Sequence, residues 1–323
     1  MSDAESKDQF CFTTGEIALL VHDLNIPAVA RTREGVRSTA LEDLPVCLCR
    51  LAYPKRWIDV AGMFGRAPPS TLCHIFYYVV DFLDKNLARF LFFDTSRITK
   101  NISRYCAVIA AKEPSSIGGE WGFIDEIIRP IYRPNKGQQA VYNGHKRVNA
   151  LKFQTVITPD GIIAHLFGPV DGRRHDLFIL NESKRKDFLH NNSAFHNKLI
   201  YGEPAYGCTK VFCCPYKGCR INTPQKELNK AMSSVRVSVE WSYAEVTKYF
   251  LFLDYKRHQR AVMTPRATLN NLGGFFTNCV TIVNGCNTNS RYFRCKALSI
   301  WRLTQALSSK PTSIISSSKL TLH

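Results

Sequence analysis

Trp-Gly-Phe-Ile-Asp at residues 121–125 is a short apolar run that ends in an acid, and this pattern predicts a buried strand. Two more strands are expected at 150–158 and 162–167, because Pro-Asp-Gly at 159–161 is a hairpin turn signal between them. A further strand is expected at 198–202. Strands interspersed with helical patterns predict an α/β domain with a mixed sheet and flanking helices.

Three carboxylates accompany these elements. Asp125 and Glu203 each end an expected strand, and Glu240 lies near the start of a helix expected at 239–253, after another at 225–234. If the strands are adjacent and the helix packs across them, the three acids converge, and their mutual repulsion calls for a cation. Oxygen ligands with open positions suit Mg²⁺ or Mn²⁺ rather than zinc, and two such ions can promote phosphodiester chemistry. A single acid at a strand end has the plainer interpretation of a cap or loop residue.

The chain before this domain has the outline of a helix-turn-helix. Residues 57–64 form a short helical pattern, 65–69 are a turn with glycine and two prolines, and a longer helix follows a cap at Ser70 or Thr71. An ordinary helical bundle with a proline turn fits the pattern equally well. In the helix-turn-helix interpretation, Ser70, Thr71 and His74 would face the major groove. Phosphates would be held by a second set: Lys55, Arg56 and Arg66.

Positive charge is in excess and unevenly placed. The 323 residues include 43 Lys and Arg against 26 Asp and Glu, a formal net charge of +17. From Tyr255 to His323 there are ten basic residues and no acid, and residues 128–159 hold six more, again without an acid. Such patterning favours a nucleic acid partner over a solvated basic face kept for solubility. The hydrophobic content of 45% excludes a wholly disordered or collagen-like chain.

Twelve cysteines without a secretory signal indicate an intracellular, reducing compartment and mostly buried thiols. The first residues are polar and acidic, unlike a signal peptide, and no apolar run reaches the roughly 18 residues of a membrane span, so no membrane partner is expected. One cluster has a spacing unlike the paired C-x2-C of zinc sites, so zinc is the less favoured interpretation there. Its members are Cys208, Cys213, Cys214 and Cys219.

Seven motifs follow one another in consistent order between residues 121 and 259. They are Gly122-Phe-Ile-Asp125, Tyr142-Asn-Gly-His-Lys-Arg147, Lys152–Gly161, Gly168–Asp176, Tyr201-Gly-Glu-Pro-Ala-Tyr206, Met232–Trp241 and Phe252–Arg257. Together they resemble the PIF/Harbinger class of DDE transposases. Leu51–Pro54 and Met63–Arg66 resemble the helix-turn-helix region of the same family.

This resemblance implies a ribonuclease H-like catalytic core that cuts DNA at transposon ends and joins them to a target with divalent metal. Asp125 would be the first acid, Glu203 the second and Glu240 the third. Asp176 also belongs to the family pattern and is a rival for the second position. Glu203 is preferred because a strand end directs its side chain at the site, whereas Asp176 has the place of a helix cap. Eight further residues would contact DNA phosphate, with plain surface charge as the alternative: Arg129, Arg133, His145, Lys146, Arg147, Arg173, Arg174 and His175.

Two positions depart from the family pattern. Glu203 stands where the family usually has Asp, and Glu126-Ile127 follows Asp125 where the family has Gly-Thr. The extra methylene moves a carboxylate by roughly 1–1.5 Å, and misplacement by about 1 Å can lower a rate on the order of 10²-fold. Bulk also replaces a flexible glycine beside Asp125. We therefore expect a transposase or transposase-derived nuclease with impaired activity. The alternative is a domesticated DNA-binding protein whose nuclease core is inactive.

The sequence divides into four expected parts. These are a flexible arm at 1–40 with one short helix expected around 16–24, a helical, helix-turn-helix-like DNA-binding region at 41–110, the endonuclease domain at 118–262, and a basic segment at 263–323 with a disordered Ser-rich tail. The resemblance implies transposon terminal repeats and target DNA as partners, and a nuclear location. A Myb-like accessory protein and a second copy of the chain are further candidate partners.

Overall fold

The computed structural model describes residues 1–92, 95–112, 118–218, 221–255 and 266–287. The chain divides into two compact units, Met1–Thr281 and Ile282–His323, and of the second only the end of helix α11 (Arg266–Asn287) is described. The Ser-rich tail of the expected C-terminal segment lies outside the described residues. No helix in the described part of the chain is both long and apolar enough to cross a membrane.

Residues 1–40, expected as a flexible arm with one short helix around 16–24, contain two helices and a strand pair. They form α1 (Asp3–Phe10), α2 (Thr14–Asp23) and an antiparallel strand pair, β1 (Val29–Arg31) with β2 (Arg37–Thr39). Each helix begins with a capping box, in which the N-cap hydroxyl and a glutamate three residues later accept hydrogen bonds from each other's backbone N–H groups. Phe10 and Phe12 are buried in the main core. Two local caps and two aromatic side chains therefore order a segment whose overall composition is polar.

Three helices follow: α3 (Ala40–Ala52), α4 (Trp57–Phe64) and α5 (Ser70–Phe92). α4 ends at Gly65, which has a left-handed φ of +60°, a conformation that glycine adopts without strain. The bounds of α4 and α5 agree with the predicted short helix, turn and longer helix. α5 packs against both α3 and strand β6 (Ile163–Asp171). Recognition of DNA by this helix pair stays a prediction.

Asp43 in α3 is fully buried. Burial raises the pKa of its carboxyl from 3.8 to about 6. Because this folded-state pKa lies above the unfolded-state value, the contribution of Asp43 to stability is complete below about pH 4. The contribution is then lost as the pH rises through 6, so this part of the fold is expected to be less stable at neutral pH than in mild acid.

Replacing Asp43 with Asn is expected to remove this dependence. Between pH 4 and pH 7.5, the free energy of unfolding of the natural chain should fall by roughly 2–3 kcal/mol more than that of the variant. Urea denaturation at the two pH values measures the difference. Asp81→Asn, at an exposed position of α5, is the matched control and should retain the natural dependence. An Asp43→Asn variant with the same pH slope as the natural chain would contradict the raised pKa.

The mixed sheet is built on β3 (Glu120–Pro130). β5 (Val148–Ile157) pairs antiparallel with β3, and β6 pairs antiparallel with β5. On the other side of β3, β7 (Leu199–Tyr201) is parallel to it, and β8 (Phe212–Cys213) is parallel to β7. β4 (Tyr142–Asn143) follows the short helix α7 (Gln138–Val141) and pairs with the start of β5. The prediction of an α/β fold with a mixed sheet is confirmed.

Two expected boundaries are wrong. β3 does not end at Asp125 but continues to Pro130, and it is paired with β5 from Phe123 to its end. The helices expected at 225–234 and 239–253 are largely one helix, α10 (Thr223–Tyr249), followed by the 3-10 turn η2 (Leu251–Leu253). No glycine interrupts α10, and its one proline, Pro224, lies in the first turn, where a missing N–H costs no helical hydrogen bond.

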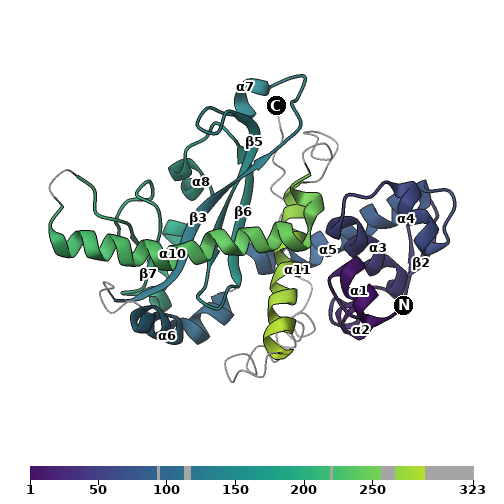
Figure 1. The fold of residues 1–323 in the computed structure, drawn as a ribbon, viewed down its shortest axis with the longest axis horizontal. Helices are drawn as coiled ribbons and strands as arrows, with labels where there is room; N and C mark the ends of the chain where they lie inside the picture. The colour runs from purple at the N-terminus through teal and green to yellow at the C-terminus, as the bar shows by residue number, and fades with distance from the viewer. Residues whose placement is uncertain (93–94, 113–117, 219–220, 256–265, 288–323) are drawn as a thin grey trace. The chain divides into compact units, whose positions relative to one another are not determined.

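Helices cover both faces of the sheet. Side chains alternate along β3, so Ile124 joins one core and Phe123 the other. The Ile124 core includes residues of α6 (Thr95–Lys112), α8 (Asp176–Glu182), α9 (Arg185–Asn191) and the 3-10 turn η1 (Ser193–Phe195). The Phe123 core includes residues of α10 and α11. Figure 1 shows α10 crossing the sheet, and it contacts β3.

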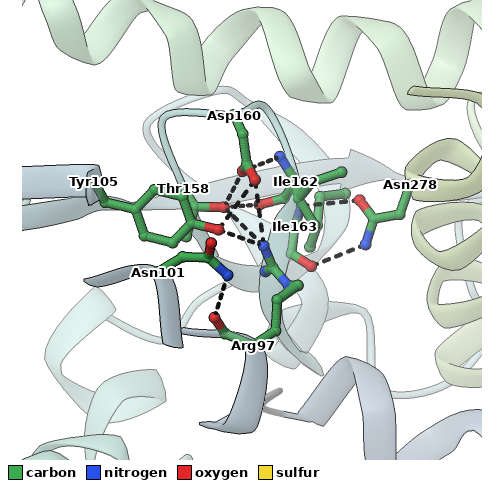
Figure 2. A network of polar contacts seen from close by, with 8 residues as sticks. All are labelled: Arg97, Asn101, Tyr105, Thr158, Asp160, Ile162, Ile163 and Asn278. Atoms are coloured by element: carbon green, nitrogen blue, oxygen red, sulfur yellow. Dashed lines mark hydrogen bonds and ion pairs between the residues drawn. The ribbon is translucent and has the colours of Figure 1, made fainter. Parts of the chain in front are cut away.

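The β5–β6 hairpin is fastened by a polar network on the turn predicted at 159–161 (Figure 2). Tyr105 Oη donates to Asp160 Oδ2 over 3.0 Å, and Arg97 Nη1 donates to Tyr105 Oη over 2.9 Å. From α11, Asn278 accepts from the Ile163 backbone N–H and donates to its carbonyl, each over 2.9 Å. The turn is thus held by α6 and α11, which fixes the register of the antiparallel strands that lead to Asp125.

Candidate catalytic site and basic surface

Asp125 and Glu203 meet because their strands are neighbours. β3 and β7 are parallel, and Phe123 pairs in register with Tyr201. Each acid lies two residues beyond that pair, where β7 has ended and β3 continues. A single guanidinium atom contacts both: Arg236 Nη1 is 3.3 Å from Asp125 Oδ2 and 3.2 Å from Glu203 Oε1. The structure therefore brings together two of the three predicted acids.

Helix α10 carries the third predicted acid. Arg236 and Glu240 are four residues apart along this helix (240 − 236 = 4), so the two backbone positions lie about one turn from each other. The side chain of Arg236 contacts Asp125 and Glu203. The side chain of Glu240 lies outside the described residues, so its part in the site stays a prediction.

The carboxylates of Asp125 and Glu203 are chemically suited to bind a hard divalent cation. Asp125 is largely buried, with 12% of its side chain exposed, whereas Glu203 is 43% exposed, so the pair combines a fixed carboxylate with an accessible one. Carboxylate oxygens are the ligands that Mg²⁺ and Mn²⁺ prefer. Asp125 and Glu203 are the residues that would hold such an ion. Among the side chains that the structure describes, no group of three or more His, Cys, Asp or Glu is placed to hold a metal.

A second charged cluster lies on the opposite face of β3. Lys152 Nζ is 2.8 Å from Glu126 Oε1 and 3.4 Å from Asp176 Oδ1. Lys152 is buried, with 8% of its side chain exposed, and Glu126 and Asp176 are partly buried, with 13% and 19% exposed. Because neighbours along a strand point to opposite faces, Glu126 faces away from Asp125. The structure thus places Asp176, the rival second acid, with Glu126 and Lys152, and places Glu203 with Asp125.

The two acids of this cluster have pKa values that are shifted in opposite directions. Burial and the hydrogen bond with Asp176 raise the pKa of Glu126 to about 8, against the opposing effect of Lys152. Burial alone would raise the pKa of Asp176, but the hydrogen bond from Glu126 and the charge of Lys152 outweigh it and lower the pKa. Glu126 is therefore a strand residue with two charged partners. It does not replace a flexible turn glycine, because β3 makes no turn there.

Two basic runs far apart in sequence adjoin at one end of the sheet. His145–Arg147 and Arg173–His175 are exposed, and we call them the basic loop pair. Asn143 Nδ2 donates to the Gly172 carbonyl over 2.9 Å, and the Arg173 N–H donates to the Ala140 carbonyl over 3.2 Å. Gly172 permits this approach, since a Cβ there would lie 2.5 Å from two carbonyl oxygens.

The other predicted DNA contacts are placed differently. Arg129 is buried, with 8% exposed, and its Nη1 lies 3.8 Å from Asp254, so it does not present its charge to solvent. Arg133 is exposed, with its Nε donating to Gln138 over 2.9 Å. In the helix-turn-helix set, Ser70 is exposed and Thr71 partly exposed at the start of α5. The four basic members each contact a neighbouring side chain: Lys55 with Gln9, Arg56 with Asp59, Arg66 with Glu42, and His74 with Glu34.

Arg236 and Lys152 were not among the site residues predicted from the sequence. Arg236 stands one helical turn before Glu240 within a matched motif, and that spacing was a usable signal. Lys152 is a lone lysine inside an otherwise buried strand, and such a lysine requires an acidic partner. The acids that contact Arg236 and Lys152 could not be predicted, because they come from strands and helices distant in sequence.

Residues 124–284 match the family model of the DDE superfamily endonucleases. The match contains Asp125, Glu203 and Glu240, and the mixed sheet with flanking helices is consistent with a nuclease domain of this class. Members of this superfamily act on DNA and generally use divalent metal ions. The comparisons with curated proteins and with solved structures found no match.

Proposed function

We propose that this chain is a transposase or transposase-derived nuclease of the PIF/Harbinger type, which binds DNA and cleaves and joins phosphodiester bonds with divalent metal. The observation that carries the proposal is the meeting of Asp125 and Glu203 at one point under α10, within the matched residues. The strand order β6–β5–β3–β7–β8, an antiparallel meander followed by two parallel strands, supports a ribonuclease H-like core.

Asp125, Glu203 and Glu240 hold the metal in this proposal. A bound Mg²⁺ or Mn²⁺ would supply the Lewis acidity that activates a water or 3′-hydroxyl and stabilises a leaving oxygen. Asp125 would supply the rigid ligand, because it is largely buried and lies within β3, where it pairs with Thr155 of β5. Arg236 Nη1 donates to both carboxylates and so offsets their repulsion.

A specific observation supports the alternative of a DNA-binding protein with an inactive core. Glu203 extends from its strand end on a side chain one methylene longer than the Asp of the family, and it is engaged by Arg236 at 3.2 Å. A cation that enters must draw Glu203 away from that partner. Restoring the family residue at Glu126 would not help, since Glu126→Gly removes an acid that pairs with Lys152. Glu203→Asp is therefore the informative restoration.

Cleavage by the purified full chain tests the proposal. The substrate is a supercoiled plasmid that carries the sequences flanking the gene, incubated with Mg²⁺, with Mn²⁺ or with EDTA. We expect strand breaks that require metal and map to repeat ends. If the chain binds DNA but does not cleave it with either metal, even after Glu203→Asp, the proposed nuclease activity is refuted. The DNA-binding alternative is then the one supported. The nuclear location, a Myb-like accessory protein and self-association belong to the same proposal and are testable by fractionation and co-purification.

The basic loop pair is expected to supply phosphate contacts. Lys146→Ala with Arg147→Ala, and separately Arg173→Ala with Arg174→Ala, should each weaken DNA binding and reduce the slope of log affinity against log salt by up to about 2. Fluorescence anisotropy across a salt series measures both quantities. Lys7→Ala with Lys112→Ala, two exposed lysines outside the loops, is the control of equal charge change. If the control and the loop variants lose DNA affinity equally, the binding reflects non-specific charge attraction instead.

A further inference from the structure

Cys208 and Cys214 form a thiol pair outside the carboxylate site. Their Sγ atoms are 3.1 Å apart, about 1 Å longer than a disulfide bond. Cys208 is exposed and Cys214 is partly exposed, so small solutes in the solvent can reach the pair. Cys213, which lies between them in sequence, is buried and directs its Sγ to the Ile200 carbonyl instead. The two outer thiols therefore face each other while the middle one faces the sheet.

The backbone holds this pair in place. The Thr209 N–H donates to the Phe212 carbonyl over 2.8 Å, and the Phe212 N–H donates to Thr209 Oγ1 over 3.0 Å, which closes a tight turn between the two cysteines. On the far side, the Gly202 N–H donates to the Cys213 carbonyl over 3.0 Å and ties the turn to the end of β7. Closure to a disulfide thus needs a small approach of side chains rather than a rearrangement of the chain.

We propose that Cys208 and Cys214 are a redox-active dithiol that closes to an intramolecular disulfide when the chain meets a small-molecule disulfide such as oxidised glutathione. The Cys208 thiolate attacks the glutathione disulfide, forming a mixed disulfide and releasing one glutathione thiolate. Cys214 then loses its proton to solvent and attacks the Cys208 sulfur, releasing the second glutathione. Two protein S–H bonds are lost and one S–S bond forms, while one glutathione disulfide is reduced to two thiols.

The order of attack follows from the environment of each thiol. Burial, together with the hydrogen bond and charge of Cys208, raises the pKa of Cys214 to about 11, so Cys214 is protonated at neutral pH. Cys208 is the more exposed of the two and is the thiol that an incoming disulfide meets first. Once the mixed disulfide has formed, contact between the two sulfurs makes closure an intramolecular step, favoured by a high effective concentration.

The test uses the reduced full chain in mixtures of oxidised and reduced glutathione, quenched with acid, alkylated, digested and mapped by mass spectrometry. We expect a disulfide between Cys208 and Cys214 that exceeds the mixed glutathione adducts on these residues by at least about tenfold. Cys214→Ser should instead accumulate the glutathione adduct on Cys208. Cys106→Ser, a partly buried thiol beside Lys198, is the matched control and should behave like the natural chain.

A second measurement reads the consequence for the backbone. Hydrogen exchange of amides in residues 203–214 should slow in the oxidised natural chain and should not change in Cys208→Ser under the same treatment. Separate glutathione adducts on both residues of the natural chain would overturn the proposal. So would pairing of either residue with Cys219, or a stoichiometric zinc ion in the purified protein that blocks oxidation of both thiols.

Discussion

Asp125→Asn is expected to reduce metal-dependent DNA cleavage by at least about 10²-fold while leaving DNA binding intact. The variant keeps the shape of the side chain but removes the buried carboxylate that the proposal assigns to the metal. Arg236 still pairs with Glu203, so the strand and the helix stay together. The rate of plasmid nicking under single-turnover conditions measures the loss, and anisotropy measures binding.

The control for Asp125→Asn is Asp187→Asn at an exposed position of α9, which loses the same charge outside the site. It should cleave at the natural rate. A nuclease activity that survives Asp125→Asn undiminished, with Asp187→Asn also active, would mean that the breaks arise elsewhere in the chain or from a contaminant. If Glu203→Asp cleaves DNA faster than the natural chain, the longer side chain of Glu203 is what impairs cleavage in the natural chain.

Lys152→Met is expected to lower the free energy of unfolding by about 3–5 kcal/mol, the largest single effect on stability that we expect. Methionine fills the space of the apolar part of the lysine side chain. It leaves Glu126 and Asp176 in the interior without their cation. Because β3 carries both Glu126 and Asp125, the loss also loosens the strand that supports the site. Urea denaturation followed by circular dichroism measures it.

Lys248→Met is the matched control for this prediction. Lys248 pairs with Glu245 at 3.0 Å on the surface of α10, with 62% of its side chain exposed, so its loss should change stability little. Adding Asp176→Asn to Lys152→Met should recover part of the stability, because Asp176 has the lowered pKa and carries the negative charge that Lys152 offsets. Equal effects of Lys152→Met and Lys248→Met would show that the buried cluster does not stabilise the fold.

Local signals in the sequence predicted much of the fold. Pro159-Asp160-Gly161 fixed the β5–β6 hairpin, and Gly65 with Ser70 bounded α4 and α5, because turn and cap preferences act over a few residues. The capping boxes at Ser2 and Thr13 are equally local. The one at Thr13 begins the short helix expected around 16–24, whereas the polar composition around Ser2 suggested a loose arm. The extension of β3 past Asp125 was missed because Glu126 breaks the apolar pattern and finds its partner only across the sheet.

The sequence by itself determined the three acids, the basic runs and the order of strands and helices, because each is written in residue type and short-range spacing. Only the tertiary structure decided which charges meet. In the structure, Asp125 and Glu203 contact Arg236, and Asp176 contacts Lys152. Cys208 contacts Cys214. Pairing of strands and packing of helices bring together residues far apart along the chain, and the low dielectric of the interior makes those encounters strong enough to define a site.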